Sequence, residues 1–152
     1  MLGAMATPLE LDPGEARSDD PEAYLLPGEY VDSDHPDVIA WAQRAIGETR
    51  GDLDKAVRLF YAVRDGFRYD PYAFTFDPED YKASRVVKRR RAFCVPKAVL
   101  LVAAARAVGV PARLGFADVR NHLTSDKLRR AMGTDVFAFH GYAELYLEGQ
   151  WV

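Results

Sequence analysis

The fold of this chain is decided by residues 93–113, which read FCVPKAVLLVAAARAVGVPAR. Between residues 98 and 108 the only charged side chain is Arg106, so this stretch predicts a helix that is buried on nearly all sides. Proline is tolerated in the first turn of a helix, because the amide that it lacks would have no partner there. Pro96 therefore places the start of the helix near Cys94.

Strands are predicted after this helix. Gly109-Val110-Pro111 is a stop signal, and residues 112–119 then predict a strand with Leu114 and Phe116 on one face. A short helix is expected around Leu128, followed by a turn at Glu148-Gly149 and a returning strand at 150–152. The clearest alternation lies at 137–147. Its first face is expected to hold Phe139, Gly141, Ala143, Leu145 and Leu147, and its second face His140, Tyr142, Glu144 and Tyr146.

Two amphipathic helices are predicted before the central one. The first begins at Asp34-His35-Pro36, where Asp34 or Ser33 can cap it, and ends at Gly47. Its apolar side chains recur at helical spacing at Val38, Ile39, Ala42 and Ile46. The second begins near Asp52. The stripe that it is expected to turn to the core consists of Leu53, Ala56, Val57, Phe60, Val63 and Phe67.

Two segments are predicted to lack regular structure. Residues 1–27 hold four prolines and are interpreted as an acidic, partly mobile leader before a domain at 28–152. Within residues 1–34, nine acidic residues face one basic residue, so this arm is either solvated or folds back onto the more basic remainder. Residues 69–87 are rich in aromatic side chains. They are expected to form a long loop that covers an end of the core or lines a cleft for peptide-like or aromatic material.

Composition places the chain among globular proteins with one core. It has 152 residues, of which 49% are hydrophobic and 28% charged, and a net charge of −3. A single cysteine excludes an internal disulfide, no stretch approaches the roughly 20 apolar residues that span a bilayer, and the first residues do not resemble a signal peptide. We expect a cytoplasmic protein without a membrane partner. The basic run at 88–91 is too short to predict a nucleic-acid partner.

Cys94 is the candidate nucleophile. A lone cysteine is usually a buried packing residue, but this one lies at a helix start and follows four basic residues, and both features stabilise a thiolate. His140, on the later strand, could accept the thiol proton and return it to a leaving amine. The free amides of the helix start, including that of Cys94, could bind an oxyanion. Histidines and one cysteine at these spacings predict no metal site, and no phosphate-binding loop or other cofactor motif is present.

Two blocks resemble the transglutaminase-like superfamily. Residues 93–113 are similar to the cysteine helix of that family and to its "R-A-x-G-[IV]-P-A-R" turn, and residues 139–152 are similar to its "H-[AG]-[WY]-x-E-x-Y-x-x-G-x-W" histidine strand. Residues 61–70 also fit the helix-to-loop segment before the cysteine. The resemblance implies an α+β, papain-like fold with N-terminal helices, in which the cysteine helix packs on an antiparallel sheet. It implies Cys94 as nucleophile and His140 as general base.

The resemblance also implies a third catalytic residue, an Asp or Asn just after the tryptophan of the returning strand. That position lies beyond Val152, so the hairpin is interpreted as truncated. Asp118, Asn121 or Asp135 could substitute, and the sequence does not choose between them. Among the other histidines, His35 is expected at the surface, whereas His122 follows a strand end and could reach a cleft.

The leading hypothesis is thiol-dependent acyl transfer on amide bonds of a peptide or protein substrate. Hydrolysis of a peptide or isopeptide bond, as in a cysteine peptidase, is favoured over cross-linking. The alternative is a non-catalytic protein-binding module that has the same fold and an incomplete triad. A third possibility, an acyltransferase of the acetyl-transferring type, would need an acyl-donor site that the sequence does not reveal.

Overall fold

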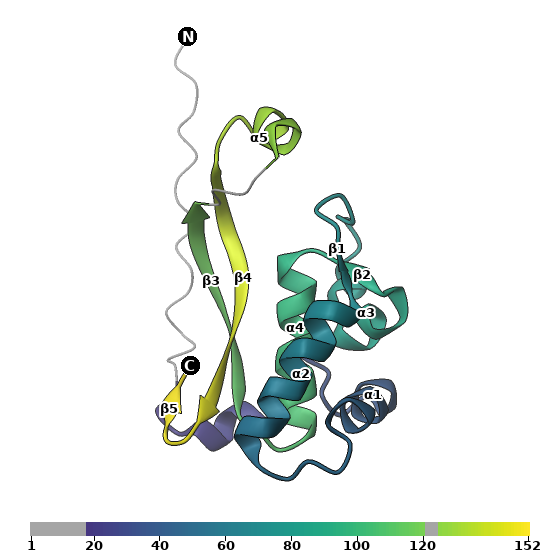
Figure 1. Ribbon diagram of the computed structural model, residues 1–152, viewed down its shortest axis with the longest axis vertical. Coiled ribbons are helices and arrows are strands. Elements are labelled where there is room, and N and C mark those ends of the chain that lie inside the picture. Colours follow the sequence, from purple (N-terminus) through teal and green to yellow (C-terminus); the bar gives the residue numbers. More distant parts are fainter. Residues whose placement is uncertain (1–17, 121–124) are drawn as a thin grey trace.

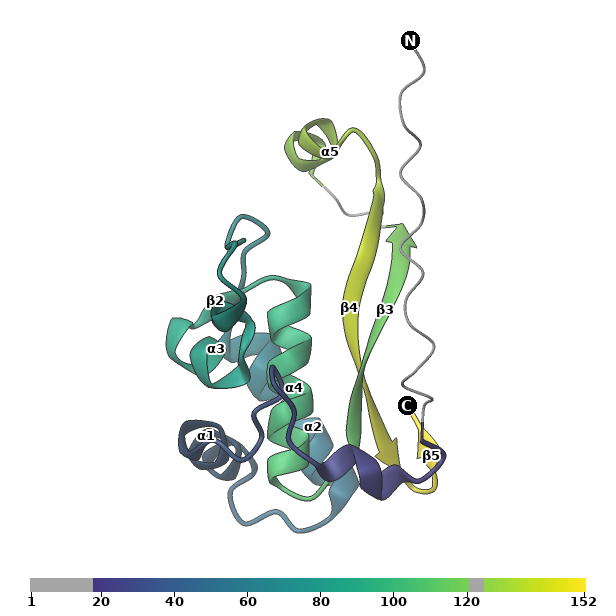
Figure 2. The same cartoon turned by 180° about the vertical axis from the view of Figure 1, so that it is seen from behind.

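Helix α4 (Cys94–Ala107) stands at the centre of the fold, with helices on one side and an antiparallel ribbon on the other (Figures 1 and 2). The structure is a computed structural model that describes residues 18–120 and 125–152. The helices are α1 (Pro36–Ile46), α2 (Asp52–Gly66), α3 (Ala83–Arg89) and α5 (Asp126–Met132), with 3-10 helices η1 (Pro21–Leu25) and η2 (Pro78–Tyr81). The strands are β1 (Arg68–Tyr69), β2 (Arg91–Ala92), β3 (Ala112–Arg120), β4 (Val136–Leu147) and β5 (Gln150–Trp151).

Two sheets hold the strands. The larger one has the order β3-β4-β5 and is antiparallel throughout, whereas β1 and β2 form a separate parallel pair. The β3–β4 ribbon runs past the first turn of α4, and α5 lies at its far tip (Figure 1). The predicted α+β arrangement, with the cysteine helix packed on an antiparallel sheet, is confirmed. No helix in the described ranges is long and apolar enough to cross a membrane.

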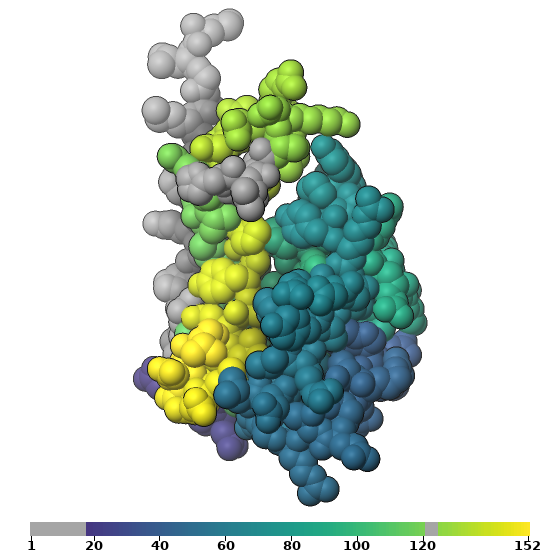
Figure 3. Space-filling view, in the orientation of Figure 1, coloured from purple at the N-terminus to yellow at the C-terminus, as the bar shows by residue number. Residues whose placement is uncertain are grey.

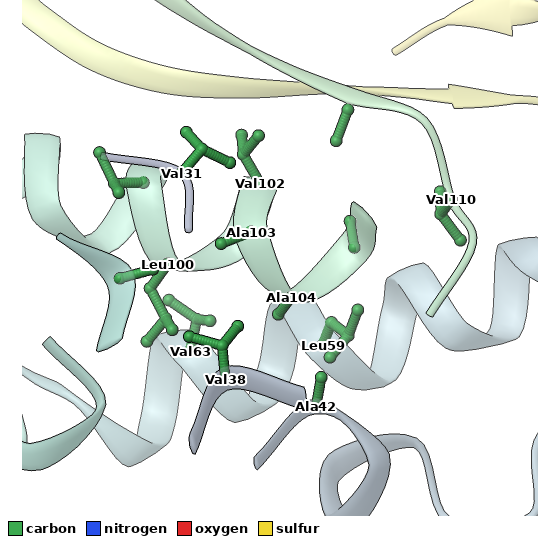
Figure 4. Close-up of a cluster of buried hydrophobic side chains, with 14 of the residues drawn as sticks. Val31, Val38, Ala42, Leu59, Val63, Leu100, Val102, Ala103, Ala104 and Val110 are labelled. Atoms are coloured by element: carbon green, nitrogen blue, oxygen red, sulfur yellow. The ribbon is translucent and has the colours of Figure 1, made fainter. Parts of the chain in front are cut away.

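The core forms where α4 meets α1 and α2 (Figure 4). Leu100 is fully buried, as are Val38 of α1 and Leu59 of α2. Small side chains at Ala103, Ala104 and Ala105 let the neighbouring helices and strands approach α4 from several directions. This explains why α4 is apolar on all sides, as its sequence predicts.

The predicted core face of α2 is partly wrong. Ala56, Leu59 and Val63 are the buried residues of this helix, whereas Leu53, Val57 and Phe60 are 45–50% exposed. Helical periodicity describes an apolar stripe but cannot choose between two adjacent stripes. Here the stripe that includes Leu59 faces α4, because the position of α4 decides which side of α2 is covered.

Three further expectations need correction. The first helix is capped by His35, whose Nδ1 accepts the Asp37 amide at 3.2 Å, and not by Asp34 or Ser33. The aromatic segment 69–87 is not one loop, because it contains η2 and most of α3. Phe139 is 71% exposed and does not share the inward face of β4, because a β-bulge interrupts the strand at this point.

The end of the predicted leader contacts the domain. Residues 18–27 include η1, whose Tyr24 ring lies 5.1 Å from the Trp151 ring in an edge-to-face arrangement. The Arg113 guanidinium lies 4.1 Å from the centre of the Trp151 ring and donates to Glu144 at 2.7 Å. Arg113 therefore joins β3, β4, β5 and η1 through one planar group.

Replacing Arg113 by lysine should lower the free energy of unfolding by about 1–2 kcal/mol, because lysine cannot both stack on Trp151 and form the same hydrogen bond to Glu144. Urea unfolding followed by tryptophan fluorescence would measure the change. Arg120→Lys is the matched control, since Arg120 and Asp135 form an exposed pair at 3.5 Å that contributes little. Equal losses in the two variants would contradict the assignment.

Candidate active site

The first turn of α4 presents Cys94 together with free backbone amides. Phe93, at the N-cap, offers no side-chain acceptor to the helix. The amides of Cys94 and Val95 have no partner inside the helix, and Pro96 has no amide to offer. The helix start therefore holds two N–H groups and the positive end of the helix dipole beside a half-buried thiol.

A β-bulge in β4 immediately precedes His140. The pairing changes from Ala117 opposite His140 to Val119 opposite Phe137, so that β4 has one extra residue there. Phe139 takes a φ of 53°, and its amide donates to Asp118 Oδ1 at 3.1 Å. A bulge redirects the side chains beside it. It explains why Phe139 leaves the inward face, and it sets the orientation of His140.

Gly141 allows β4 to approach the start of α4. A Cβ atom at this position would lie 2.9 Å from Val95 Cα and 3.0 Å from Val95 Cγ2. The first of these atoms belongs to the helix backbone, which cannot turn aside as a long side chain can. The residue after His140 therefore contacts the residue after Cys94 at a distance that only glycine permits.

Cys94 and His140 line one cavity of about 240 Å³ between α2, α4 and β4. Tyr69, Lys97 and Arg64 also border it, together with apolar side chains such as Phe60. Figure 3 shows the surface hollowed between β4, in yellow, and the teal segment that follows β1. Lys127 of α5 lies over the ring of Tyr72, in the segment that follows β1, with Nζ 5.8 Å from the ring centre.

Tyr69 is a site residue that the sequence did not reveal. The β1–β2 pair places Tyr69 opposite Ala92, and so beside the residues that lead into Cys94. Burial raises the pKa of Tyr69, and negative charge on Cys94 raises it further. The phenol therefore stays neutral and can donate a hydrogen bond into the cavity. Its position depends on a pairing of two residues per strand, which periodicity does not detect.

Lys97 connects the first turn of α4 to the end of α2 by two hydrogen bonds. Its Nζ donates to the carbonyl oxygens of Phe67 at 2.7 Å and Arg64 at 3.2 Å. Burial lowers the pKa of Lys97, and the charge on Asp65 opposes that shift. Arg64 pairs with Asp65 at 2.7 Å, and its guanidinium lies 4.5 Å from the centre of the Tyr61 ring. Arg64 belongs to α2, and Lys97 is held by carbonyl groups at the end of α2, so α2 positions both cations at the cavity.

The basic run at 88–91 does not supply these cations. Lys88 pairs with Asp37 at 2.9 Å, Arg89 with Asp80, and Arg91 with Asp70 at 3.5 Å. These ion pairs brace α3 and β2 against neighbouring segments. Lys97 and Arg64 border the cavity of Cys94, whereas residues 88–91 are not among its lining residues.

The predicted substitutes for a third catalytic residue are occupied elsewhere or lie outside the described residues. Asp118 accepts the Phe139 amide, Asp135 pairs with Arg120, and Asn121 falls in the undescribed segment, as does His122. His140 Nδ1 is buried and has no hydrogen-bond partner among residues 18–120 and 125–152. His35 is partly exposed, as expected, and belongs to the cap of α1.

Comparison with known proteins supports the same interpretation of the fold. The family model described as "Transglutaminase-like superfamily" matches residues 39–152. A proposed cysteine protease from Cytophaga hutchinsonii has a similar structure, with a TM-score of 0.69, 20% identity, and coverage of 93% of this chain and 43% of that one. A proposed protease from Parabacteroides distasonis ATCC 8503 gives a TM-score of 0.51, 14% identity, and coverage of 89% and 26%. This chain thus spans less than half the length of either protein. A search of curated proteins found no match.

Proposed function

Since this chain belongs to the transglutaminase-like superfamily, we propose that it carries out thiol-dependent acyl transfer on amide bonds, with hydrolysis of peptide or isopeptide bonds as the main outcome. The observation that carries the proposal is the shared cavity of Cys94 and His140. A thiol and an imidazole that border one cavity beside free helix amides supply the three functions that acyl transfer needs: a nucleophile, a proton carrier and an oxyanion site.

Each group has a defined part in the proposed reaction. The sulfur of Cys94 forms a bond to the substrate carbonyl carbon, while His140 holds the thiol proton and the carbonyl oxygen takes the negative charge. The amides of Cys94 and Val95 donate to that oxygen. The C–N bond then breaks, and the amine leaves with the proton from His140. Water next replaces sulfur on the carbonyl carbon, which releases the acid and returns the proton to the thiol.

The alternative is a protein-binding module with the same fold. A catalytic histidine normally has an orienting group that accepts its second ring N–H, and residues 18–120 and 125–152 do not identify that group, because His140 Nδ1 has no hydrogen-bond partner among them. Both candidates predict the same fold and the same exposed aromatic surface, so chemistry at Cys94 must separate them.

The test is acylation of Cys94 by p-nitrophenyl acetate at pH 6.5. The enzyme hypothesis predicts a burst of nitrophenol, an adduct of one acetyl group on Cys94 by peptide mass spectrometry, and its removal by hydroxylamine. The rate per thiol should exceed that of a small reference thiol, which has a pKa of about 8.5 and is mostly protonated at this pH. Cys94→Ala should show no adduct. Acylation no faster than that of the reference thiol would favour the binding module.

A further inference from the structure

A second cavity adjoins the start of α4, and His140 is not among the residues that line it. It has a volume of about 440 Å³ and lies between the segment after β1, the strand β3 and the floor formed by α4. Val95 and Val99 form that floor, and Phe74, Phe76 and Phe116 are among its walls. No charged side chain borders it within the part of the chain that the structure describes. A volume of this size falls in the range of small-ligand pockets.

The two cavities lie on adjacent faces of the same helical turn. Cys94, Ala98 and Leu101 are spaced as one helix face and line the first cavity, whereas Val95 and Val99 are spaced as the next face and line the second. Cys94 thus borders the first cavity, and the next residue along the helix, Val95, borders the second. The two cavities therefore flank the first turns of α4, where the thiol lies.

The aromatic wall of the second cavity is braced in place. The Phe74 ring lies 5.0 Å from the Phe76 ring, edge to face, and 6.3 Å from that of Phe93, the residue before Cys94. The Tyr81 hydroxyl donates to the Thr75 carbonyl at 2.9 Å, and the Thr75 hydroxyl donates to Asp80 at 2.9 Å. These bonds hold the wall in shape without a bound ligand, so little ordering is required on binding.

The rim of this cavity exposes large aromatic surfaces. Phe76 is 92% exposed, Phe74 59% and Phe116 53%. An apolar group that enters the pocket would remove these exposed ring surfaces from water, and that burial would stabilise the complex. The pocket thus suits an aromatic or large aliphatic side chain and disfavours a charged one, which would lose hydration there without a partner.

The position of His140 indicates which part of the substrate reaches this pocket. The leaving amine must meet His140 to receive its proton, and His140 borders the first cavity only. The acyl part, on the opposite side of the scissile bond, then extends across the start of α4 toward the second cavity. We propose that the second cavity is the specificity pocket for a large apolar side chain, best an aromatic one, on the acyl side of the scissile amide. This inference rests on the proposed function.

Two chloromethyl ketones, with iodoacetamide as a reference reagent, test the proposed specificity pocket. N-acetyl-phenylalanyl and N-acetyl-glycyl chloromethyl ketones each form a carbon–sulfur bond to Cys94 and release chloride, so their rate ratio reports the side-chain pocket. Iodoacetamide reports thiol reactivity alone. The wild-type ratio of phenylalanyl to glycyl rates should be roughly tenfold or more, as expected when an apolar pocket binds a large group. The rates would be followed by intact-protein mass.

Variants of the rim locate the selectivity. Phe76→Ser and Phe116→Ser should each lower the ratio, whereas Leu53→Ser, on α2 and about as exposed as Phe116, should leave it unchanged. A ratio near one beside a fast iodoacetamide reaction would overturn the pocket and leave the proposed function intact. A ratio unaffected by both rim variants would also overturn it. A slow iodoacetamide reaction with a high ratio would reject the activated thiol and retain the pocket.

Discussion

Replacing His140 by alanine is expected to slow the acylation of Cys94 by about 10²–10⁴-fold, because that is the usual contribution of a positioned acid–base group. The residual reaction should rise with pH as for an ordinary thiol, since no partner would then hold the thiol proton. The measurement is the burst rate with p-nitrophenyl acetate between pH 5.5 and 9. A pH profile distinguishes loss of the proton carrier from simple damage to the fold.

His35→Ala is the matched control for this variant. It removes a second histidine, but one that caps α1 and lies outside the cavity of Cys94. The loss of a helix cap should lower the free energy of unfolding by about 0.5–2 kcal/mol and leave the acylation rate unchanged. Wild-type kinetics in His140→Ala would remove His140 from the mechanism and favour the binding module.

Gly141→Ala is expected to damage both stability and chemistry. The new Cβ would lie 2.9 Å from the Val95 backbone, so β4 must move away from the helix start. Overpacking of this kind typically lowers the free energy of unfolding by about 1–3 kcal/mol. A shift of about 1 Å between reacting groups costs on the order of 10²-fold in rate. Urea unfolding and the acylation burst would measure the two effects separately.

Gly28→Ala provides the control, because a Cβ at that position meets no atom within 4 Å. It should match the wild-type protein in both measurements. If Gly141→Ala also did so, the close approach of β4 to α4 would not determine the geometry of the site. A variant that lost only stability would show that the thiol and the imidazole tolerate the movement of the strand.

Much of the site follows from local sequence. Pro96 and the apolar run after it predict where α4 begins, and the match to the family's histidine strand selects His140; the structure then brings both residues to one cavity. Tyr69 and Lys97 could not be selected in this way. Tyr69 depends on the β1–β2 pairing, and Lys97 depends on two carbonyls at the end of α2, so neither role is encoded near the residue itself.

The sequence by itself determined α1, α2, α4, α5 and the strands β3 to β5 with their order, because caps, prolines, glycines and apolar periodicity act over a few neighbouring residues. Only the tertiary structure decided which face of α2 is buried, that Lys97 and Arg64 border the cavity instead of the basic run, and that a bulge precedes His140. Each of these depends on contacts between residues far apart in the chain. Local sequence patterns do not specify such contacts, because these contacts form only when the helices and strands pack together.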